Sequence, residues 1–327
     1  MDIFYANNAI YHKRRLGFPS ILSNVLEKKR HKRYNFCYVC DDVGNGVISI
    51  AIRTKYAAQV AYVGTKYAGW QRQAEALGVQ QVLEEALQRL SDGPVKVVGA
   101  GRTDSGVHAV GQVASFIMSR EWDADRLAIA ANFYLPPDVS LMCARRVPDD
   151  FDARRNALWR EYRYFIWHGG SCWPHLRDMT WWRKHQWDAD YVREACRILE
   201  GNHDFRAFCK TGECPEESTR TISRLRYKKI GGLSVVTARA PSFLMNMVRI
   251  IVGSLDRVGR GKEPVSWVRE LLGEAGGGRE PERRFSGATA PACGLYFWRA
   301  AYEDFVFAGE PRSILGGVTN VWDRYRD

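Results

Sequence analysis

Hydrophobic and polar positions alternate regularly from Tyr56 onward, and the first hundred residues of this pattern predict four strands and two helices. Strand-like stretches occupy residues 56–62, 95–98, 110–118 and 139–147. Apolar residues recur at helical spacing over residues 79–90 and 123–133. Turn-forming residues follow each helix, at 91–93 and 136–137.

The pattern then repeats with a second set of elements. Strands are predicted at residues 161–167, 221–229, 233–240 and 294–302, and helices at 188–200, 243–258 and 263–272. Gly231-Gly232 is a hairpin signal, and Ser242 is placed to cap the helix that starts at residue 243. Hairpin strands interrupted by single helices favour the α+β class. We expect two halves, residues 51–150 and 151–305, to share one antiparallel sheet with helices on one side and a cleft between the halves.

The two ends of the chain lack this regularity. Residues 1–50 contain a basic run at 28–33 and a turn-like stretch at 41–46, and we interpret them as an appended segment. An RNA-binding arm, a flexible extension and translated sequence upstream of the true start all fit it. Residues 306–327 are predicted to form a tail.

Composition narrows the class of protein. The 327 residues carry a net charge of +11, and 46% of them are hydrophobic, enough for one large folded domain or two moderate ones. Such an excess of positive charge attracts polyanions, which makes nucleic acid the leading partner, although a basic enzyme with a small substrate has the same charge.

The cysteine spacing and the absence of long apolar runs indicate the cellular compartment in which the protein is expected. The cysteines are irregularly spaced without a secretion signal, which favours a reducing cytoplasm over a disulfide framework. Cys37 and Cys40 form a CxxC pair, but a structural zinc site needs four ligands and no second pair lies nearby, so we expect no metal. No apolar run reaches the length of a membrane span, and we expect no membrane association.

Candidate chemistry centres on the glycine-containing segment 101–108, which includes Asp104 and connects two predicted strands. An ordinary turn is one interpretation, because Asp often bonds nearby amides in loops. A second interpretation is that Asp104 is the partner of a buried arginine. Arg249 is the candidate, since it lies within a helix that is apolar on nearly every face. A buried guanidinium keeps its proton and requires a carboxylate partner, so Arg249 could pair with Asp104; it could also reach solvent or pair with a structural acid.

Two tyrosines point to a base-binding role. Tyr162 and Tyr164 are two positions apart in a predicted strand, so they share a face of the sheet. One of them could stack on a nucleobase, although tyrosines in strands also serve as core residues.

Many short segments, in order along the chain, resemble motifs of the TruA family of tRNA pseudouridine synthases. They lie at 67–73, 79–80, 83–87, 101–108, 111–113, 135–139, 151–154, 162–164, 201–208, 220–222, 243–255 and 288–296. The resemblance implies the pseudouridine synthase fold, in which two ferredoxin-like or RRM-like halves share a sheet around a basic active-site cleft. The sequence departs from the family pattern at four positions, which are Val63, Ser105, Asp152 and Asn246.

The resemblance also assigns roles to individual residues. Asp104 corresponds to the catalytic aspartate, Arg102 to the arginine of the same motif, Tyr162 to the tyrosine at the substrate uracil and Arg249 to the arginine that pairs with the aspartate. The implied activity is isomerisation of uridine to pseudouridine in the anticodon stem-loop of tRNA, at positions 38–40, by a homodimer that shares one tRNA. This reaction requires no cofactor, and the sequence lacks a P-loop or dinucleotide-binding fingerprint. A catalytically inactive tRNA-binding protein or RNA chaperone is the alternative.

Overall fold

The computed structural model describes residues 3–6, 9–12, 53–274, 281–303 and 307. The chain divides into two compact units, residues 1–53 and 54–327. In the first unit, strands β1 (Ile3–Ala6) and β2 (Ala9–His12) pair antiparallel. The basic run at 28–33, the pair Cys37 and Cys40, and the tail from residue 308 onward lie outside the described residues.

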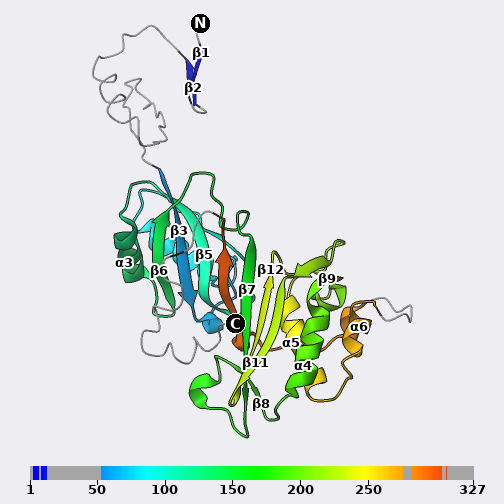
Figure 1. Ribbon diagram of the computed structural model, residues 1–327. Helices are drawn as coiled ribbons and strands as arrows, with labels where there is room; N and C mark the ends of the chain where they lie inside the picture. The colour runs from blue at the N-terminus through cyan, green and yellow to red at the C-terminus, as the bar shows by residue number, and fades with distance from the viewer. Residues whose placement is uncertain (1–2, 7–8, 13–52, 275–280, 304–306, 308–327) are drawn as a thin grey trace. The chain divides into compact units, whose positions relative to one another are not determined.

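The second unit is built on a large sheet (Figure 1). Seven strands follow the order β11-β12-β7-β13-β5-β3-β6, while β4 pairs with β5 and β8 with β7. Their bounds are β3 (Thr54–Tyr62), β4 (Val98–Gly99), β5 (His108–Met118), β6 (Val139–Arg146), β7 (Trp159–His168), β8 (Trp181–Arg183), β11 (Arg224–Ile230), β12 (Leu233–Ala240) and β13 (Leu295–Ala301). Strands β9 (Gly201–Asp204) and β10 (Thr219–Ile222) form a separate pair.

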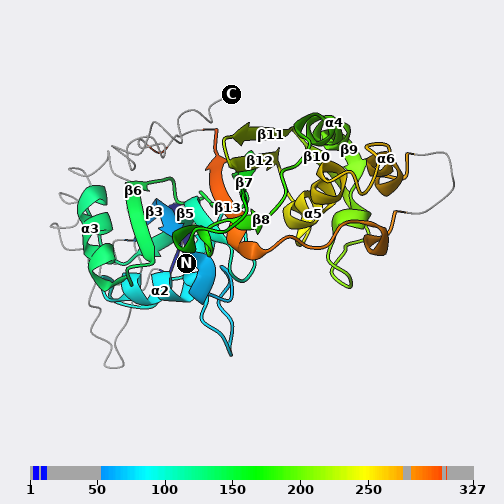
Figure 2. The same cartoon turned by 90° about the horizontal axis from the view of Figure 1, so that it is seen from below.

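Five α-helices accompany the sheet in the described part of this unit. They are α2 (Val79–Gln88), α3 (Ala124–Tyr134), α4 (Ala189–Leu199), α5 (Met247–Gly259) and α6 (Trp267–Leu271). Asp123 and Asp188 cap α3 and α4, because each side chain accepts a hydrogen bond from an amide of the first turn. The view from below in Figure 2 shows α4 next to strand β11 and α5 next to α4, and α5 also contacts β7.

The two halves of the sheet meet where β13 pairs with β5. This pair is parallel, with Tyr296 opposite His108 and Phe297 opposite Ala109, whereas the other neighbours along the seven-strand path are antiparallel. Strand β13, the last strand within the described residues, is thus inserted between β7 and β5. The expected α+β class and shared sheet are confirmed, and the sheet is mixed because the halves join through one parallel pair. The predicted boundary near residue 150 falls between β6 and β7.

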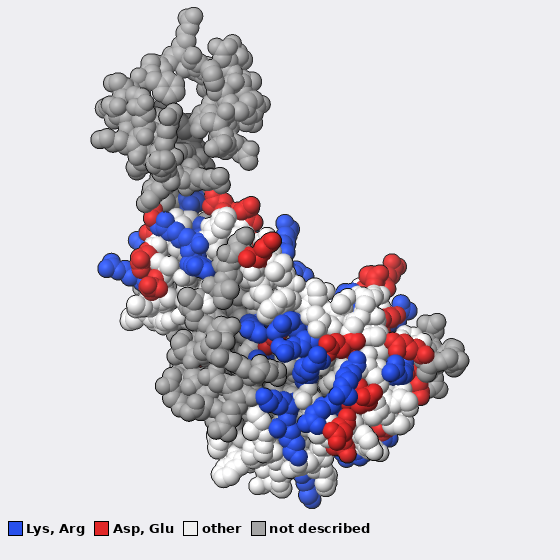
Figure 3. Space-filling model, in the orientation of Figure 1, with Lys and Arg blue, Asp and Glu red and all other residues white. Residues whose placement is uncertain are grey.

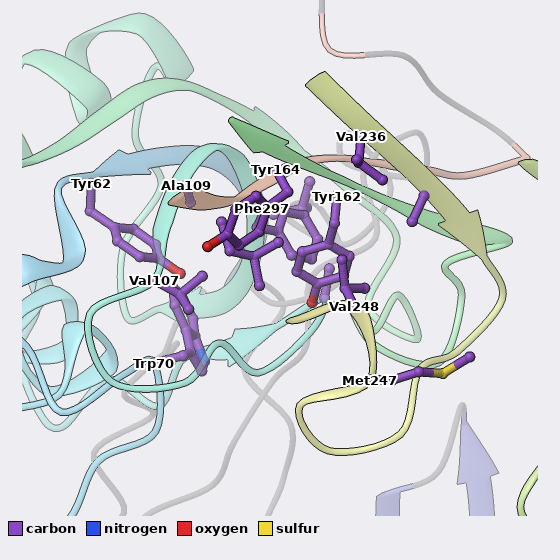
Figure 4. Close-up of a cluster of buried hydrophobic side chains, with 14 of the residues drawn as sticks. Tyr62, Trp70, Val107, Ala109, Tyr162, Tyr164, Val236, Met247, Val248 and Phe297 are labelled. Atoms are coloured by element: carbon purple, nitrogen blue, oxygen red, sulfur yellow. The ribbon is translucent and has the colours of Figure 1, made fainter. Parts of the chain in front are cut away.

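One face of this sheet holds the main hydrophobic core. Alternate residues of β7, including Tyr162 and Tyr164, belong to the same buried cluster as Val236 of β12 and Val248 of α5. Figure 4 shows these side chains together with Phe297 of β13. Since β7, β13 and α5 all contribute, this core fixes the C-terminal half against the seam of the sheet.

The observed elements differ from the predicted ones mainly at helix α5 and at short strands. Helix α5 begins at Met247, four residues after the predicted start, and Asn246 rather than Ser242 is its N-cap. The predicted strand at 95–98 shrinks to β4, and α6 is shorter than predicted. The patterns also missed β8 and β9, which have three and four residues and are too short for a recognisable period.

Candidate active site

Asp104 lies in the loop that connects β4 to β5, at the seam of the sheet. The amide of Val107 donates to the carbonyl of Asp104 at 3.2 Å, and this turn is completed by Gly106 with φ 78°. A glycine with its freedom of φ is required at such a position. The loop therefore holds Asp104 as the first residue of a defined turn.

The segment before α2 holds the Asp104 loop from one side. The amide of Trp70 donates to the carbonyl of Thr103 at 3.0 Å, and the hydroxyl of Tyr62 lies 2.8 Å from Thr103 Oγ1. Gly69 approaches so closely that a Cβ atom at this position would lie 2.4 Å from the carbonyl oxygen of Thr103. This explains why a glycine-aromatic segment precedes α2, and it fixes the backbone next to Asp104.

Arg249 reaches this loop from helix α5, in the other half of the unit. Its Nη1 donates to Oδ2 of Asp104 at 3.1 Å, while its Nε donates to the carbonyl of Ala290 at 2.8 Å. The side chains of Arg249 and Asp104 are 17% and 31% exposed, so the ion pair is partly shielded from solvent but remains accessible. The structure thus brings together the two residues that the sequence suggested as partners, and it sets a fixed positive charge beside the carboxylate.

Tyr162 lies on β7 next to the same loop. It is 8% exposed, and its ring makes edge contacts with Phe243 and Phe297, with centroids 5.2 and 5.1 Å apart. Its hydroxyl donates to the carbonyl of Arg102 at 3.4 Å. Burial raises the pKa of Tyr162, with smaller contributions from Tyr62 and the Asp104 carboxylate, so its hydroxyl stays protonated at neutral pH.

The two remaining candidates, Tyr164 and Arg102, differ in exposure. Tyr164, the partner of Tyr162 in the period-two pattern, is fully buried and donates to the carbonyl of Pro291 at 2.7 Å, which makes it a core residue. Arg102 has an exposed side chain, and its carbonyl is the acceptor for Tyr162. Asp104, Arg249, Tyr162 and Arg102 therefore lie around one loop.

His108 closes the same motif but serves the fold. It is 1% exposed, its Nδ1 accepts from the amide of Gly64 at 3.1 Å, and its ring stacks on Tyr296 with centroids 4.7 Å apart. Because Nδ1 is an acceptor, Nε2 carries the proton and donates to the carbonyl of Cys293 at 3.1 Å. Burial lowers the pKa of His108, which keeps it neutral while it joins β5 to the segment before β13.

The described residues show neither a metal-binding cluster nor a membrane-spanning helix. No group of three or more His, Cys, Asp or Glu side chains within them is arranged to hold a metal ion. None of the helices described there is long and apolar enough to cross a membrane.

Comparison with known proteins decides the family. A family model described as tRNA pseudouridine synthase matches residues 58–154 and 195–303. The chain is 40% identical over 252 residues to tRNA pseudouridine synthase A of Beijerinckia indica, with 76% of this chain and 94% of that protein covered. The chain belongs to the tRNA pseudouridine synthase family.

Other relatives carry the same name. The chain is 38% identical over 250 residues to tRNA pseudouridine synthase A of Pseudoalteromonas atlantica, covering 76% of this chain and 93% of the relative. For the protein of that name from Pseudomonas aeruginosa, the identity is 37% over 251 residues, and the coverage is 76% and 86%. A solved crystal structure of a Cbf5-Nop10-Gar1 complex aligns with 76% of this chain and 50% of that chain, with a TM-score of 0.30 and 13% identity.

The family match includes both members of the ion pair. Asp104 lies in the first matched segment and Arg249 in the second, while Tyr162 lies between the two segments. Both members of the ion pair at the seam of the sheet therefore fall within the family match.

Arg160 is a residue of this site that the sequence reasoning missed. Its guanidinium donates to the carbonyls of Ala100 at 2.9 Å, Pro241 at 2.7 Å and Ala157 at 3.2 Å. It thereby joins the segment before Asp104 to the segment that leads into α5. Burial lowers its pKa, and carbonyl oxygens rather than a carboxylate surround it. Backbone acceptors leave no pattern in a sequence, so only the alternation of β7 could have hinted at this residue.

Proposed function

We propose that this protein isomerises uridine to pseudouridine in the anticodon stem-loop of tRNA, at positions 38–40, with Asp104 as the catalytic carboxylate. The observation that carries the proposal is the contact of Asp104 with Arg249 across the seam of a sheet in a member of the tRNA pseudouridine synthase family. An ionised, partly exposed carboxylate held by a rigid guanidinium is suited to act as a nucleophile or a base.

The reaction balances without any added group. The bond between ribose C1′ and uracil N1 breaks, the base turns, C1′ bonds to C5, the C5 proton leaves and N1 gains a proton. Asp104 can attack C1′ or remove a sugar proton while the glycosidic bond breaks, and both routes use the same ionised oxygen. Since substrate and product are isomers, we propose that the enzyme works without a cofactor.

Tyr162 and Arg102 supply the proposed contacts with the nucleotide. A target uridine has to leave its stack, which costs a few kcal/mol. The ring of Tyr162 lies beside the Asp104 loop and can stack on the uracil, which offsets part of that cost. The exposed guanidinium of Arg102 can fill the vacated space or bind a phosphate.

The charge distribution supports a polyanionic substrate. Figure 3 shows Lys and Arg side chains gathered over the part of the second unit that contains β11, β12 and α4, with acidic side chains among them. Strand β11 alone has the sequence RLRYKKI, with four basic residues in seven. Phosphate contacts by such residues make RNA affinity fall steeply as the salt concentration rises.

We further propose that the protein acts as a cytoplasmic homodimer in which two subunits share one tRNA. The likeness to the TruA motifs supports the homodimer, and the net charge of +11 supports the binding of a polyanion such as tRNA. Light scattering on the purified protein should give twice the chain mass of 37.3 kDa, and a monomer at micromolar concentration would contradict it.

Conversion of unmodified tRNA tests the proposed function. Purified protein without cofactor should form pseudouridine at one or more of positions 38–40 in transcripts that carry uridine there, and transcripts with cytidine at these positions are the matched control. Binding without conversion would instead support the inactive tRNA-binding or RNA chaperone alternative. Release of free uracil would indicate a nucleosidase, and conversion elsewhere in the tRNA would contradict the proposed positions.

A further inference from the structure

Helix α5 is preceded by a residue with a left-handed backbone. Asn246 has φ 60° and ψ 5°, and among the described residues it is the only non-glycine residue with positive φ. This conformation is unfavourable for residues with a Cβ atom, although Asn tolerates it better than most. Glycine would fit with less strain, so the presence of Asn calls for a contribution from its side chain.

That side chain does not cap the helix. An Asn at the N-cap ordinarily accepts a hydrogen bond from an amide in the first turn, but α5 has no such bond. Instead, Oδ1 of Asn246 accepts from Nη1 of Arg249 at 3.1 Å. The same Nη1 donates to Oδ2 of Asp104. One guanidinium nitrogen is thus shared between the amide of Asn246 and the proposed catalytic carboxylate.

The turn that carries Asn246 is anchored independently of Arg249. The amide of Lys210 donates to the carbonyl of Met245 at 3.0 Å, and the amide of Met247 donates to the carbonyl of Leu244 at 3.1 Å. Asn246 is therefore held in place by its neighbours on both sides, and it can serve as a fixed point for the long side chain of Arg249.

We propose that Asn246 is a positioning residue that holds the Arg249 guanidinium in the orientation from which Nη1 meets Asp104. The inference rests on the proposed function and adds the group that orients the ion pair. A guanidinium is planar and rigid, so the contacts with Asn246 and Ala290 together fix its plane. The side-chain amide of Asn246 is uncharged, so it can share Nη1 of Arg249 with Asp104. A carboxylate at this position would compete with Asp104 for that nitrogen.

Substitution by glycine separates the side chain from the backbone. Asn246→Gly keeps the left-handed turn and removes only the amide, so it should fold as the wild type does. We expect kcat for unmodified tRNA to fall about tenfold while KM stays within about twofold, because the loss affects the transition state rather than RNA binding. Asn246→Asp should lose more, since it draws Arg249 away from Asp104. Met245→Ala, on the same turn with a 42% exposed side chain, is the matched control and should keep wild-type kcat.

A double-mutant cycle tests whether Asn246 acts through Arg249. Once Arg249→Lys has removed the guanidinium, adding Asn246→Gly should cost no further activity. Wild-type kcat in Asn246→Gly would show that the residue serves the turn alone and would overturn the proposal. Losses that multiply in the double variant, or a raised KM with unchanged kcat, would overturn it as well.

A crystal structure of Asn246→Gly tests the positioning role without relying on pseudouridine formation. If the wild type forms no pseudouridine, the proposed function fails, but the structure still decides the positioning role. A guanidinium that has moved away from Asp104 supports the role. An unchanged contact between Arg249 Nη1 and Asp104 Oδ2 contradicts it.

Discussion

Single residues in this molecule show how position and hydrogen-bond partners give chemically similar groups different roles. Tyr162 and Tyr164 share a strand face, yet one borders the Asp104 loop and the other bonds a core carbonyl. His108 lies in the same motif as Asp104 and is buried as a neutral link between two segments. The sequence could predict that a guanidinium within an apolar helix requires an acceptor, and the resemblance to the TruA motifs, rather than the pattern, assigned Asp104 to that role. The sequence could not predict Arg160, whose partners are backbone carbonyls.

The neutral state of His108 makes stability depend on pH. Burial lowers its folded-state pKa below the ordinary value of 6.5, and the pKa of buried His168 is lowered in the same way. The unfolded state therefore binds more protons just below pH 6.5, so the stabilisation is complete above this pH and is lost as the pH falls through the folded-state values.

We expect the free energy of unfolding, measured by urea titration, to decrease between pH 7 and pH 5. In His108→Asn this decrease should be smaller, because His168 alone still contributes. The exposed His175 provides the control, since His175→Asn should show the wild-type slope. A slope in His108→Asn equal to that of the wild type would show that His108 does not cause the pH dependence.

At the scale of elements, the position of the site follows from how α5 and β13 meet the sheet. Periodicity predicted both elements, since local alternation reflects which face is buried. It misplaced the start of α5, because an N-cap signal at Ser242 competes with the left-handed turn at Asn246, and that turn depends on contacts distant in sequence. Local pattern also says nothing about strand order, so the parallel pairing of β13 with β5 could come only from the structure.

The close approach of α5 to the segment before β13 gives a testable consequence. A Cβ atom on Gly253 would lie 1.7 Å from the carbonyl oxygen of Ala288, so Gly253→Ala has to push the helix away from this segment. We expect the free energy of unfolding to fall by about 1–3 kcal/mol, as for overpacked cores. Activity should fall as well, because Ala290 in the same segment binds Arg249. Gly170→Ala is the matched control, since nothing lies within 4 Å of its added Cβ atom. Unchanged stability of Gly253→Ala would contradict the packing described here.

At the scale of the whole molecule, the sheet joins two halves so that each contributes one member of the ion pair. Asp104 comes from the loop before β5 and Arg249 from α5, 145 positions later in the chain. Neither half alone contains both groups, and Arg160 adds bonds across the same seam. Catalysis should therefore depend on the integrity of the sheet as well as on the residues at the site.

Replacement of Asp104 by its uncharged isostere is the most direct test of this account. In a single-turnover assay with unmodified tRNA, Asp104→Asn should form pseudouridine at least about 1,000-fold more slowly than the wild type, a loss of about 4 kcal/mol in transition-state stabilisation. Its affinity for the tRNA should stay within about threefold, because the phosphate contacts remain. Conversion by Asp104→Asn at a rate close to that of the wild type would contradict the assignment of Asp104 as the catalytic carboxylate.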